Sequence, residues 1–248
     1  NGASETDHAA ARGGMRGALM EWLTAKVLRV RRETDDIATI FFTVPGRDFH
    51  YIAGQYITVF FEQSSTPEGK AYSLSSAPYE KLLSITVKEV GEYSGRLHAL
   101  REGDSFMISE AYGTFNPQTT KPLVCISAGC GLAPIWSILK DELHRDTDRQ
   151  VRLFFSNKTV DSIPFFDDLN ACQAMHRGVK IYQYITRQYD VPADMKKGRI
   201  DLDECVSAVP NEVTYLVCGS VDFVRDMWRG LVKRGVDGGS ISTETFFE

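Results

Sequence analysis

The sequence predicts two domains, an antiparallel β-barrel with Greek-key-like strand order followed by an α/β domain with a parallel sheet. Its 248 residues are 43% apolar and 25% charged, which is ordinary for a globular protein and long enough for two cores. Short strand-like runs separated by turns fill residues 22–115, whereas strand-like and helix-like runs alternate after Pro122. We therefore expect a barrel domain over residues 20–119 and an α/β domain over residues 120–248.

The N-terminal segment, residues 1–19, is small, polar and glycine-rich and shows no hydrophobic period. It is expected to be a disordered tail or a linker from an upstream domain.

In the first domain, turn sequences such as Pro45-Gly46 and Glu102-Gly103-Asp104 separate short runs with strand character. The helix expected there covers residues 94–100. The expected strands cover residues 22–31, 37–44, 56–62, 71–75, 83–90 and 106–109. Strands this short and this closely spaced are typical of a sandwich or barrel.

In the second domain, continuous runs of Val, Ile, Leu and Phe alternate with helical runs, which is typical of a parallel sheet covered on both faces. The expected strands cover residues 123–127, 151–156, 179–186, 213–218 and 240–246. The expected helices cover residues 133–145, 164–175, 202–209 and 221–234.

Charge and cysteine usage exclude several function classes. The net charge of -5 argues against a nucleic-acid partner, because phosphate binding needs a basic face. No apolar run approaches the roughly 20 residues that a membrane-spanning helix needs, and no secretory signal begins the chain, so we expect a cytoplasmic protein. Five cysteines without a C-x-x-C pair, and five scattered histidines, fit neither a disulfide framework nor a metal centre. Redox chemistry here would need an organic cofactor.

The strongest local motif is the glycine turn at residues 126–134, Ile-Ser-Ala-Gly-Cys-Gly-Leu-Ala-Pro. It follows a predicted strand and opens a helix, where glycines let the backbone approach a pyrophosphate and the helix N-terminus favours an anion. A plain glycine turn between strand and helix is the alternative. Pro134 stands where the usual dinucleotide fingerprint has its third glycine.

Two further segments lie in the barrel domain. In residues 70–78, Tyr72 precedes hydroxyl residues on a strand and can lie against a planar ligand, while Lys70 can meet a phosphate. In residues 87–97, Ser94 can cap a short helix whose N-terminus faces an anion. The alternatives are a serine-rich strand end and a cap without a ligand.

Together these motifs resemble the ferredoxin–NADP reductase superfamily of flavoprotein reductases, over roughly residues 22–247. Members carry Arg-x-Tyr-(Ser/Thr), Gly-x-x-Ser, Gly-x-Gly-x-x-Pro, a late Cys-Gly, and an acidic-aromatic C-terminal segment. The matching segments occur here in the same order: Lys70 to Ser73, Gly91 to Ser94, Gly129 to Pro134, Cys218-Gly219-Ser220 and Glu244-Thr245-Phe246. Lys70 departs from the usual Arg and would give the pyrophosphate a point charge instead of a bidentate fork.

The resemblance implies an FAD site on the barrel. Tyr72 would pack on the flavin or its ribityl chain, and Ser73 would lie near flavin N5, with Leu74 beside it. The FAD pyrophosphate would be held by Lys70, Gly91, Tyr93 and Ser94. The backbone of Val87 and Lys88 would lie near the ribose or adenine.

The resemblance also implies an NAD(P)H site on a Rossmann-like domain. Cys218, followed by Gly219, would sit beside nicotinamide C4 and shape the hydride path without acting as a nucleophile; a buried inert thiol is the alternative. Phe246 would cover the second flavin face, although Phe247 could take that place. The nucleotide would contact Gly129, Cys130, Gly131 and Pro134, with Thr186 and Arg187 near a 2′-phosphate. Ser73, Cys218 and Phe246 would thus surround the reacting atoms.

The function implied is that of an FAD-dependent NAD(P)H oxidoreductase, similar to the reductases of hybrid-cluster proteins, flavohaemoglobins and oxygenase systems. Hydride would pass from nicotinamide to flavin, and electrons would pass to a redox protein or a fused redox domain, which leaves open whether the chain is one module of a longer protein. The alternatives are a flavin-binding regulatory subunit, which would show little ferricyanide reductase activity, and a free-flavin reductase, which would retain little FAD.

Overall fold

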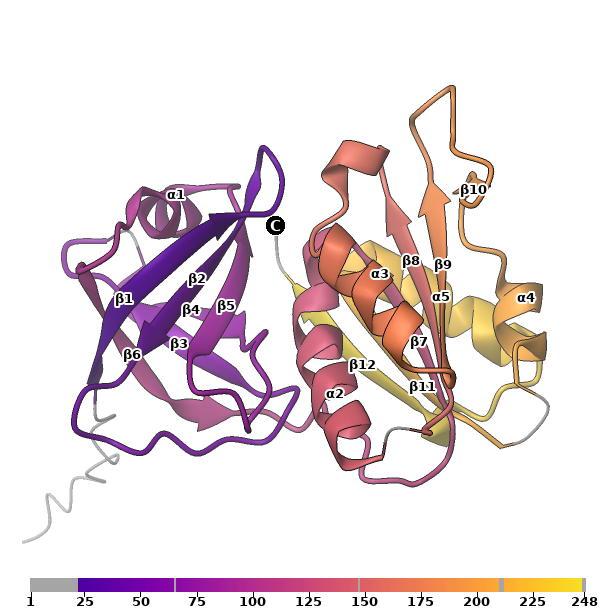
Figure 1. The fold of residues 1–248 in the computed structure, drawn as a ribbon, viewed down its shortest axis with the longest axis horizontal. Coiled ribbons are helices and arrows are strands. Elements are labelled where there is room, and N and C mark those ends of the chain that lie inside the picture. Colours follow the sequence, from indigo (N-terminus) through magenta and orange to yellow (C-terminus); the bar gives the residue numbers. More distant parts are fainter. Residues whose placement is uncertain (1–21, 65, 147, 210–211, 247–248) are drawn as a thin grey trace, which may run out of the picture.

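The structure is a computed structural model that describes residues 22–64, 66–146, 148–209 and 212–246. Figure 1 shows two lobes side by side, with β1 to β6 in one and β7 to β12 in the other. The expectation of a disordered tail or linker at residues 1–19 lies outside the described residues.

The first lobe is a six-stranded antiparallel sheet in the order β4-β3-β6-β1-β2-β5. Its elements are β1 (Leu23–Arg32), β2 (Ile37–Thr43), β3 (Tyr56–Phe60), β4 (Lys70–Ser73), β5 (Leu83–Lys88), α1 (Glu92–Ala99) and β6 (Ser105–Tyr112). The edge strands β4 and β5 meet through a single bridge, Leu74 with Ile85. The sheet is therefore barrel-like and is not fully closed.

Alternation along the strands separates the core of this lobe from its outer face. Leu23, Ala25 and Val27 of β1 point inward and are buried, as their period of two predicts. In β2 and β5, Ile40 and Ile85 are buried in the same core.

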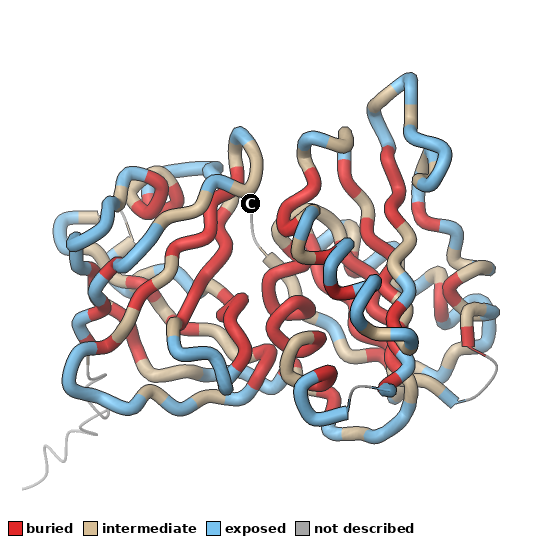
Figure 2. Tube along the Cα trace, viewed as in Figure 1, coloured by how far each residue is buried: buried red, intermediate tan, exposed pale blue. Residues whose placement is uncertain are grey.

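The second lobe is a six-stranded parallel sheet in the order β10-β9-β8-β7-β11-β12. Its strands are β7 (Leu123–Ala128), β8 (Val151–Asn157), β9 (Val179–Ile185), β10 (Lys196–Lys197), β11 (Thr214–Ser220) and β12 (Ile241–Phe246). Its helices are α2 (Leu132–Arg145), α3 (Phe166–Met175), α4 (Leu202–Ser207) and α5 (Val221–Lys233). Figure 2 shows these strands as mostly buried between the helices.

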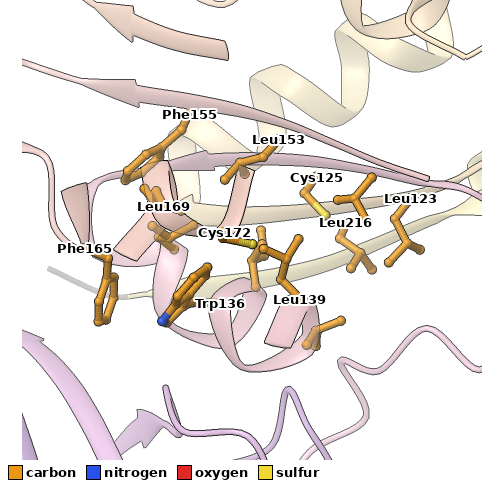
Figure 3. Packing of buried hydrophobic residues seen from close by; sticks show 14 of the residues in the cluster. Leu123, Cys125, Trp136, Leu139, Leu153, Phe155, Phe165, Leu169, Cys172 and Leu216 are labelled. Carbon is orange, nitrogen blue, oxygen red and sulfur yellow. The ribbon is translucent and has the colours of Figure 1, made fainter. Parts of the chain in front are cut away.

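The two faces of this sheet have separate cores. Trp136 and Leu139 of α2 and Leu169 of α3 pack against Phe155 and Leu216 on one face, as Figure 3 shows. On the other face, α4 and α5 cover a second cluster. Helices on both faces explain why the strands read as continuous apolar runs.

The structure differs from the expected elements at helix ends and in β6, which runs to Tyr112 instead of ending at Ser109. Helix α1 begins at Glu92, two residues before the expected start, and α3 begins at Phe166 because Phe165 is left-handed, with φ 58° and ψ 27°. The short strand β10 and the 3₁₀ turns η1 (Gly129–Gly131), η2 (Val160–Ser162) and η3 (Gly238–Ser240) were not expected. Such short elements follow from local turn geometry that carries no hydrophobic period.

Candidate active site

The barrel half of the site lies on β4 and the chain around it. Ser73 ends β4 and is buried, Tyr72 is half-buried, and Lys70 is exposed. Burial raises the pKa of the Tyr72 phenol, with smaller contributions from Tyr93 and Cys130, so this side chain stays neutral. The Lys70 ammonium lies 6.0 Å from the centre of the Tyr93 ring. A neutral aromatic surface and a cation are therefore close together.

Helix α1 is fixed by hydrogen bonds at its first turn. Its N-cap is Gly91, and Ser94 is the third helical residue instead of the cap itself. The Ser94 hydroxyl accepts hydrogen bonds from the Val90 N–H (2.8 Å) and the Gly91 N–H (2.9 Å). The buried Tyr93 donates its hydroxyl to the Thr66 carbonyl at 2.6 Å. These bonds hold in place a helix N-terminus whose dipole favours an anion near Lys70.

The glycine turn forms η1 and leads directly into α2. Gly129 has a φ of +51°, and a Cβ on Gly131 would come within 2.5 Å of the Cys218 carbonyl oxygen. One glycine thus supplies the left-handed conformation, and the other lets the turn lie against β11. Pro134 is buried in the first turn of α2, where its missing N–H costs nothing. The close packing against β11 requires a glycine at position 131, a left-handed backbone favours one at position 129, and the turn also presents a helix N-terminus to a ligand.

Cys130 connects the two lobes. Its sulfur lies 3.7 Å from the carbonyl oxygen of Thr86 on β5. The next residue of the turn, Gly131, lies against Cys218, and Thr86 donates a hydrogen bond to Ser75 of the barrel motif. Residues of the barrel motif, the glycine turn and the Cys-Gly motif therefore meet in one region.

Cys218 lies on β11 next to the glycine turn and is fully buried. Burial raises the pKa of its thiol well above the ordinary value, with smaller contributions from Glu244 and Cys130. A thiol that stays protonated is a poor nucleophile. Gly219 follows it, and a Cβ there would come within 2.7 Å of the Phe223 ring. Cys218 can therefore shape the site but is not suited to covalent chemistry.

The last described strand, β12, runs parallel to β11 and ends between the two lobes in Figure 1. Glu244 lies opposite Cys218 in the register, and burial raises the pKa of its carboxyl. Phe246 is partly buried and packs against the core under α2 and α3. Phe247 lies outside the described residues, so the choice between the two phenylalanines as a cover stays a prediction.

Thr186 and Arg187 follow the end of β9 and are exposed. The Thr186 hydroxyl donates to the Asn157 carbonyl at 3.1 Å, and the Arg187 N–H donates to the Lys158 carbonyl at 2.8 Å. These bonds hold the ends of β8 and β9 together, and the Arg187 side chain faces solvent.

Three residues predicted to contact FAD, Leu74, Val87 and Lys88, differ in which of their atoms could reach a ligand. The side chains of Leu74 and Val87 are buried in the barrel core, and the ammonium of Lys88 lies 3.5 Å from Asp36. The Val87 carbonyl accepts a hydrogen bond from His98 at 2.8 Å, if the ring nitrogen there is protonated. The Leu74 N–H donates to the Gln55 carbonyl at 2.9 Å, so the side chains of Leu74 and Val87 and these two backbone groups are already engaged within the barrel lobe.

Sequence reasoning missed two polar residues at the carboxyl edge of the parallel sheet. Ser127 near the end of β7 and Asn157 at the end of β8 are buried. In the described part of the chain, the Ser127 hydroxyl and both amide atoms of Asn157 have no hydrogen-bond partner. Buried polar groups in folded proteins are rarely left unpaired. Ser127 stood within the glycine segment and could have been named from its position, whereas nothing in the sequence marked the Asn157 amide as unpaired.

Within the described ranges, no group of three or more His, Cys, Asp or Glu residues is placed to hold a metal ion. No helix in those ranges is both long and apolar enough to cross a bilayer.

Comparison with protein-family models matches residues 125–228 to the oxidoreductase NAD-binding domain. The flavohemoprotein of Bordetella pertussis is 30% identical over 256 residues, covering 93% of this chain and 62% of that protein. Reductase component 1 of terephthalate 1,2-dioxygenase from Comamonas sp. is 27% identical over 212 residues, covering 82% and 62%. The chain therefore spans about three-fifths of the length of these curated relatives.

Solved structures share the whole two-lobe arrangement. The flavohem-like FAD/NAD-binding domain of nitric oxide dioxygenase from Vibrio cholerae superposes with a TM-score of 0.81 at 25% identity, covering 90% of this chain and 98% of that one. A ferredoxin NADP+ reductase from Neisseria gonorrhoeae with bound FAD and NADP gives a TM-score of 0.79 at 22% identity, covering 91% and 99%. The second likeness concerns the fold alone.

Proposed function

Because the chain belongs to the ferredoxin–NADP reductase superfamily, we propose that it is an FAD-dependent oxidoreductase that takes hydride from NADH or NADPH and passes electrons to a separate acceptor. The observation that carries the proposal is the contact of Cys130 with Thr86, because it brings the glycine turn of the nucleotide domain to the barrel strand beside the Tyr72 motif. Nucleotide and flavin rings bound by these two motifs would meet where the lobes meet.

The barrel residues fit FAD. The neutral Tyr72 ring offers a surface for the flavin or its ribityl chain, and Ser73 would lie near flavin N5. The N-terminus of α1 and the Lys70 ammonium would hold the pyrophosphate. Lys70 would act as a point charge, since a lysine lacks the two-pronged geometry of an arginine.

The nucleotide-domain residues fit NAD(P)H. The turn from Gly129 to Gly131 and the start of α2 offer backbone N–H groups to a pyrophosphate. The unpaired polar atoms of Ser127 and Asn157 lie near the same carboxyl edge and would gain partners from a polar ligand. Arg187, which is exposed, would meet a 2′-phosphate if NADPH is the donor.

Bound together, the two cofactors supply hydride transfer and the release of electrons singly or in pairs. The chain supplies the positions in which the two rings are held. Cys218 stays a neutral thiol beside the reacting region, and Phe246 would cover the site from β12. No general base is needed, which agrees with a site whose buried thiol and phenol remain protonated.

The acceptor is proposed to be a redox protein or a fused redox domain, because the similar proteins are named as a flavohemoprotein and a dioxygenase reductase component. A cytoplasmic location is proposed from the cysteine usage of the sequence, an odd number of five residues without a C-x-x-C pair.

The test is the visible spectrum of the purified protein, followed by anaerobic addition of NADH or NADPH. We expect a yellow protein whose flavin bands bleach, and faster bleaching with one nucleotide identifies the donor. A protein that stays colourless after incubation with FAD would contradict the proposal.

A further inference from the structure

The two lobes have further contacts besides Cys130, such as the ion pair of Lys140 with Glu80, and one of them lies around the carboxylate of Glu33. This residue follows β1, and its side chain is only 5% exposed. Its oxygens accept hydrogen bonds from Arg31 Nε at 2.7 Å, the Thr39 hydroxyl at 2.6 Å and the Phe165 backbone N–H at 3.2 Å. Phe165 belongs to the nucleotide lobe, so this barrel carboxylate holds the start of α3 directly.

Arg31 strengthens the same contact. Its guanidinium binds Asp168 of α3 at 2.6 Å while it also binds Glu33, and it lies 5.6 Å from the centre of the Phe165 ring. Phe165 in turn stacks on Trp136 of α2, with ring centres 5.7 Å apart. The Glu33 contact therefore reaches both helices that cover one face of the parallel sheet.

Hydroxyl groups connect Glu33 to the site. The Thr39 hydroxyl lies 2.9 Å from that of Thr86, which donates to Ser75 at 2.9 Å, two residues after Ser73. Thr86 is also the residue whose carbonyl contacts Cys130. All these hydroxyl-bearing residues are buried. Buried hydroxyl groups at these distances tend to fix one arrangement of the groups they join.

The left-handed backbone of Phe165 also indicates that the Glu33 contact holds one arrangement of the start of α3. Phenylalanine rarely adopts a φ of +58°, and such a conformation persists where the surroundings over-determine it. Here the surroundings are the Glu33 carboxylate at its N–H and the Arg31 and Trp136 side chains at its ring.

We propose that Glu33 is a positioning residue that sets how the nucleotide lobe sits on the barrel, and thereby aligns the two bound rings for hydride transfer. The proposal rests on the function proposed above. The role needs an acceptor at both carboxyl oxygens, because Arg31, Thr39 and Phe165 all donate to Glu33 and the amide of a glutamine would place an N–H against one of these donors.

The test compares Glu33→Gln with Thr39→Val, and uses Glu102→Gln as a control that removes the same charge from an exposed turn. Stopped-flow mixing under anaerobic conditions gives the limiting rate of flavin bleaching and the nucleotide concentration for half of that rate. We expect Glu33→Gln to slow the limiting rate about tenfold and Thr39→Val about threefold, with the half-saturating concentration within about twofold of wild type, because misalignment affects the reacting geometry more than nucleotide binding. Glu102→Gln should match wild type.

Hydrogen–deuterium exchange on the protein without added nucleotide gives a readout that does not depend on activity. In Glu33→Gln, exchange at the start of α3 should become faster, while exchange in α4 on the opposite face should not change. Thr39→Val keeps the Glu33 carboxylate but removes one of its hydrogen-bond donors, so this variant replaces Glu33→Gln in the test if Glu33→Gln does not fold.

Equal bleaching rates in wild type and in both folded variants would overturn the positioning role, even if exchange at α3 increased. A parallel loss of limiting rate, nucleotide affinity and FAD retention would also overturn it, because that is general damage. A wild-type protein that holds FAD but is bleached by neither nucleotide would overturn the proposed function, and this proposal with it.

Discussion

The two halves of the candidate site are built differently. The nucleotide half is made of backbone: Gly131 lies against the Cys218 carbonyl, and Cys218 is itself fully buried. The barrel half is made of side chains that reach solvent in part, such as Tyr72 and Lys70. A backbone site is fixed by the same packing that folds the domain, whereas a side-chain site can change its ligand affinity without changing the fold. Mutations in the nucleotide half should therefore lower the stability of the fold, whereas mutations in the barrel half should lower ligand affinity.

The largest expected effect is on the backbone half. Gly131→Ala places a methyl group against the β11 backbone, which cannot move aside as a flexible side chain could. We expect a loss of about 3 kcal/mol in the free energy of unfolding, measured by urea denaturation, together with loss of nucleotide-dependent bleaching. Gly129→Ala meets no atom within 4 Å and should cost only about 1 kcal/mol, from its left-handed backbone. Equal losses in the two variants would contradict the close-packing argument.

Tyr72→Ala should act on binding. Loss of the aromatic surface is expected to weaken FAD about tenfold, measured by fluorescence titration, because ring contacts of this kind contribute on the order of 1 kcal/mol beyond the area they bury. The free energy of unfolding of the protein without FAD should change much less than in Gly131→Ala. Tyr72→Phe is the control and should bind FAD as wild type does. A Tyr72→Ala variant with unchanged FAD affinity would remove this residue from the proposed site.

A smaller change in affinity is expected at Lys70, which is exposed. Lys70→Ala should weaken FAD about threefold at low salt, and the difference should shrink as salt screens the charge. Lys70→Arg should bind FAD more tightly than wild type, because a guanidinium can engage two phosphate oxygens. Titrations at two salt concentrations measure both effects, and salt-independent results would exclude a charge contact.

The smallest expected effect is a pH-dependent change in stability caused by substituting Glu244. Burial raises the pKa of this carboxyl in the folded protein above its ordinary value of 4.5, so the folded state binds the proton more tightly than the unfolded state. The carboxyl therefore contributes stability at low pH that is lost as pH rises through the folded pKa. Glu244→Gln should accordingly be more stable than wild type at pH 7 and not at pH 4, as thermal unfolding at both pH values would show. The reverse order would contradict the burial of Glu244.

The sequence predicted the architecture because its signals are hydrophobic periods. The inward alternation of Leu23, Ala25 and Val27 and the apolar runs of the parallel strands are such periods, and both lobes formed as expected. The glycine turn and the Tyr72 motif were visible as well, because particular residue types stand at particular spacings, and the structure brings them together through Cys130.

Other features depend on three-dimensional placement that no local pattern encodes. The left-handed Phe165 shifted the start of α3, and the carboxylate that accepts its N–H belongs to Glu33, just after β1 and 132 residues earlier in the chain. The Asn157 amide is unpaired because of the groups that surround the end of β8, and the local sequence does not encode which groups these are. Ser94 was expected as the helix cap, but Gly91 takes that place. The Ser94 hydroxyl, at the third helical position, instead accepts from the N–H groups of Val90 and Gly91, just before the helix.

The barrel has a seam between β4 and β5, where Leu74 and Ile85 make one bridge. Strands normally protect their free edges, since a bare row of peptide groups attracts unwanted partners. On the β5 side of this seam, the Ser84 carbonyl accepts a hydrogen bond from the Ser75 N–H at 2.8 Å, and the Thr86 carbonyl lies 3.7 Å from the Cys130 sulfur. The open edge of the barrel is therefore covered in part by the glycine turn of the other lobe, which leaves less of it free to pair with a foreign strand.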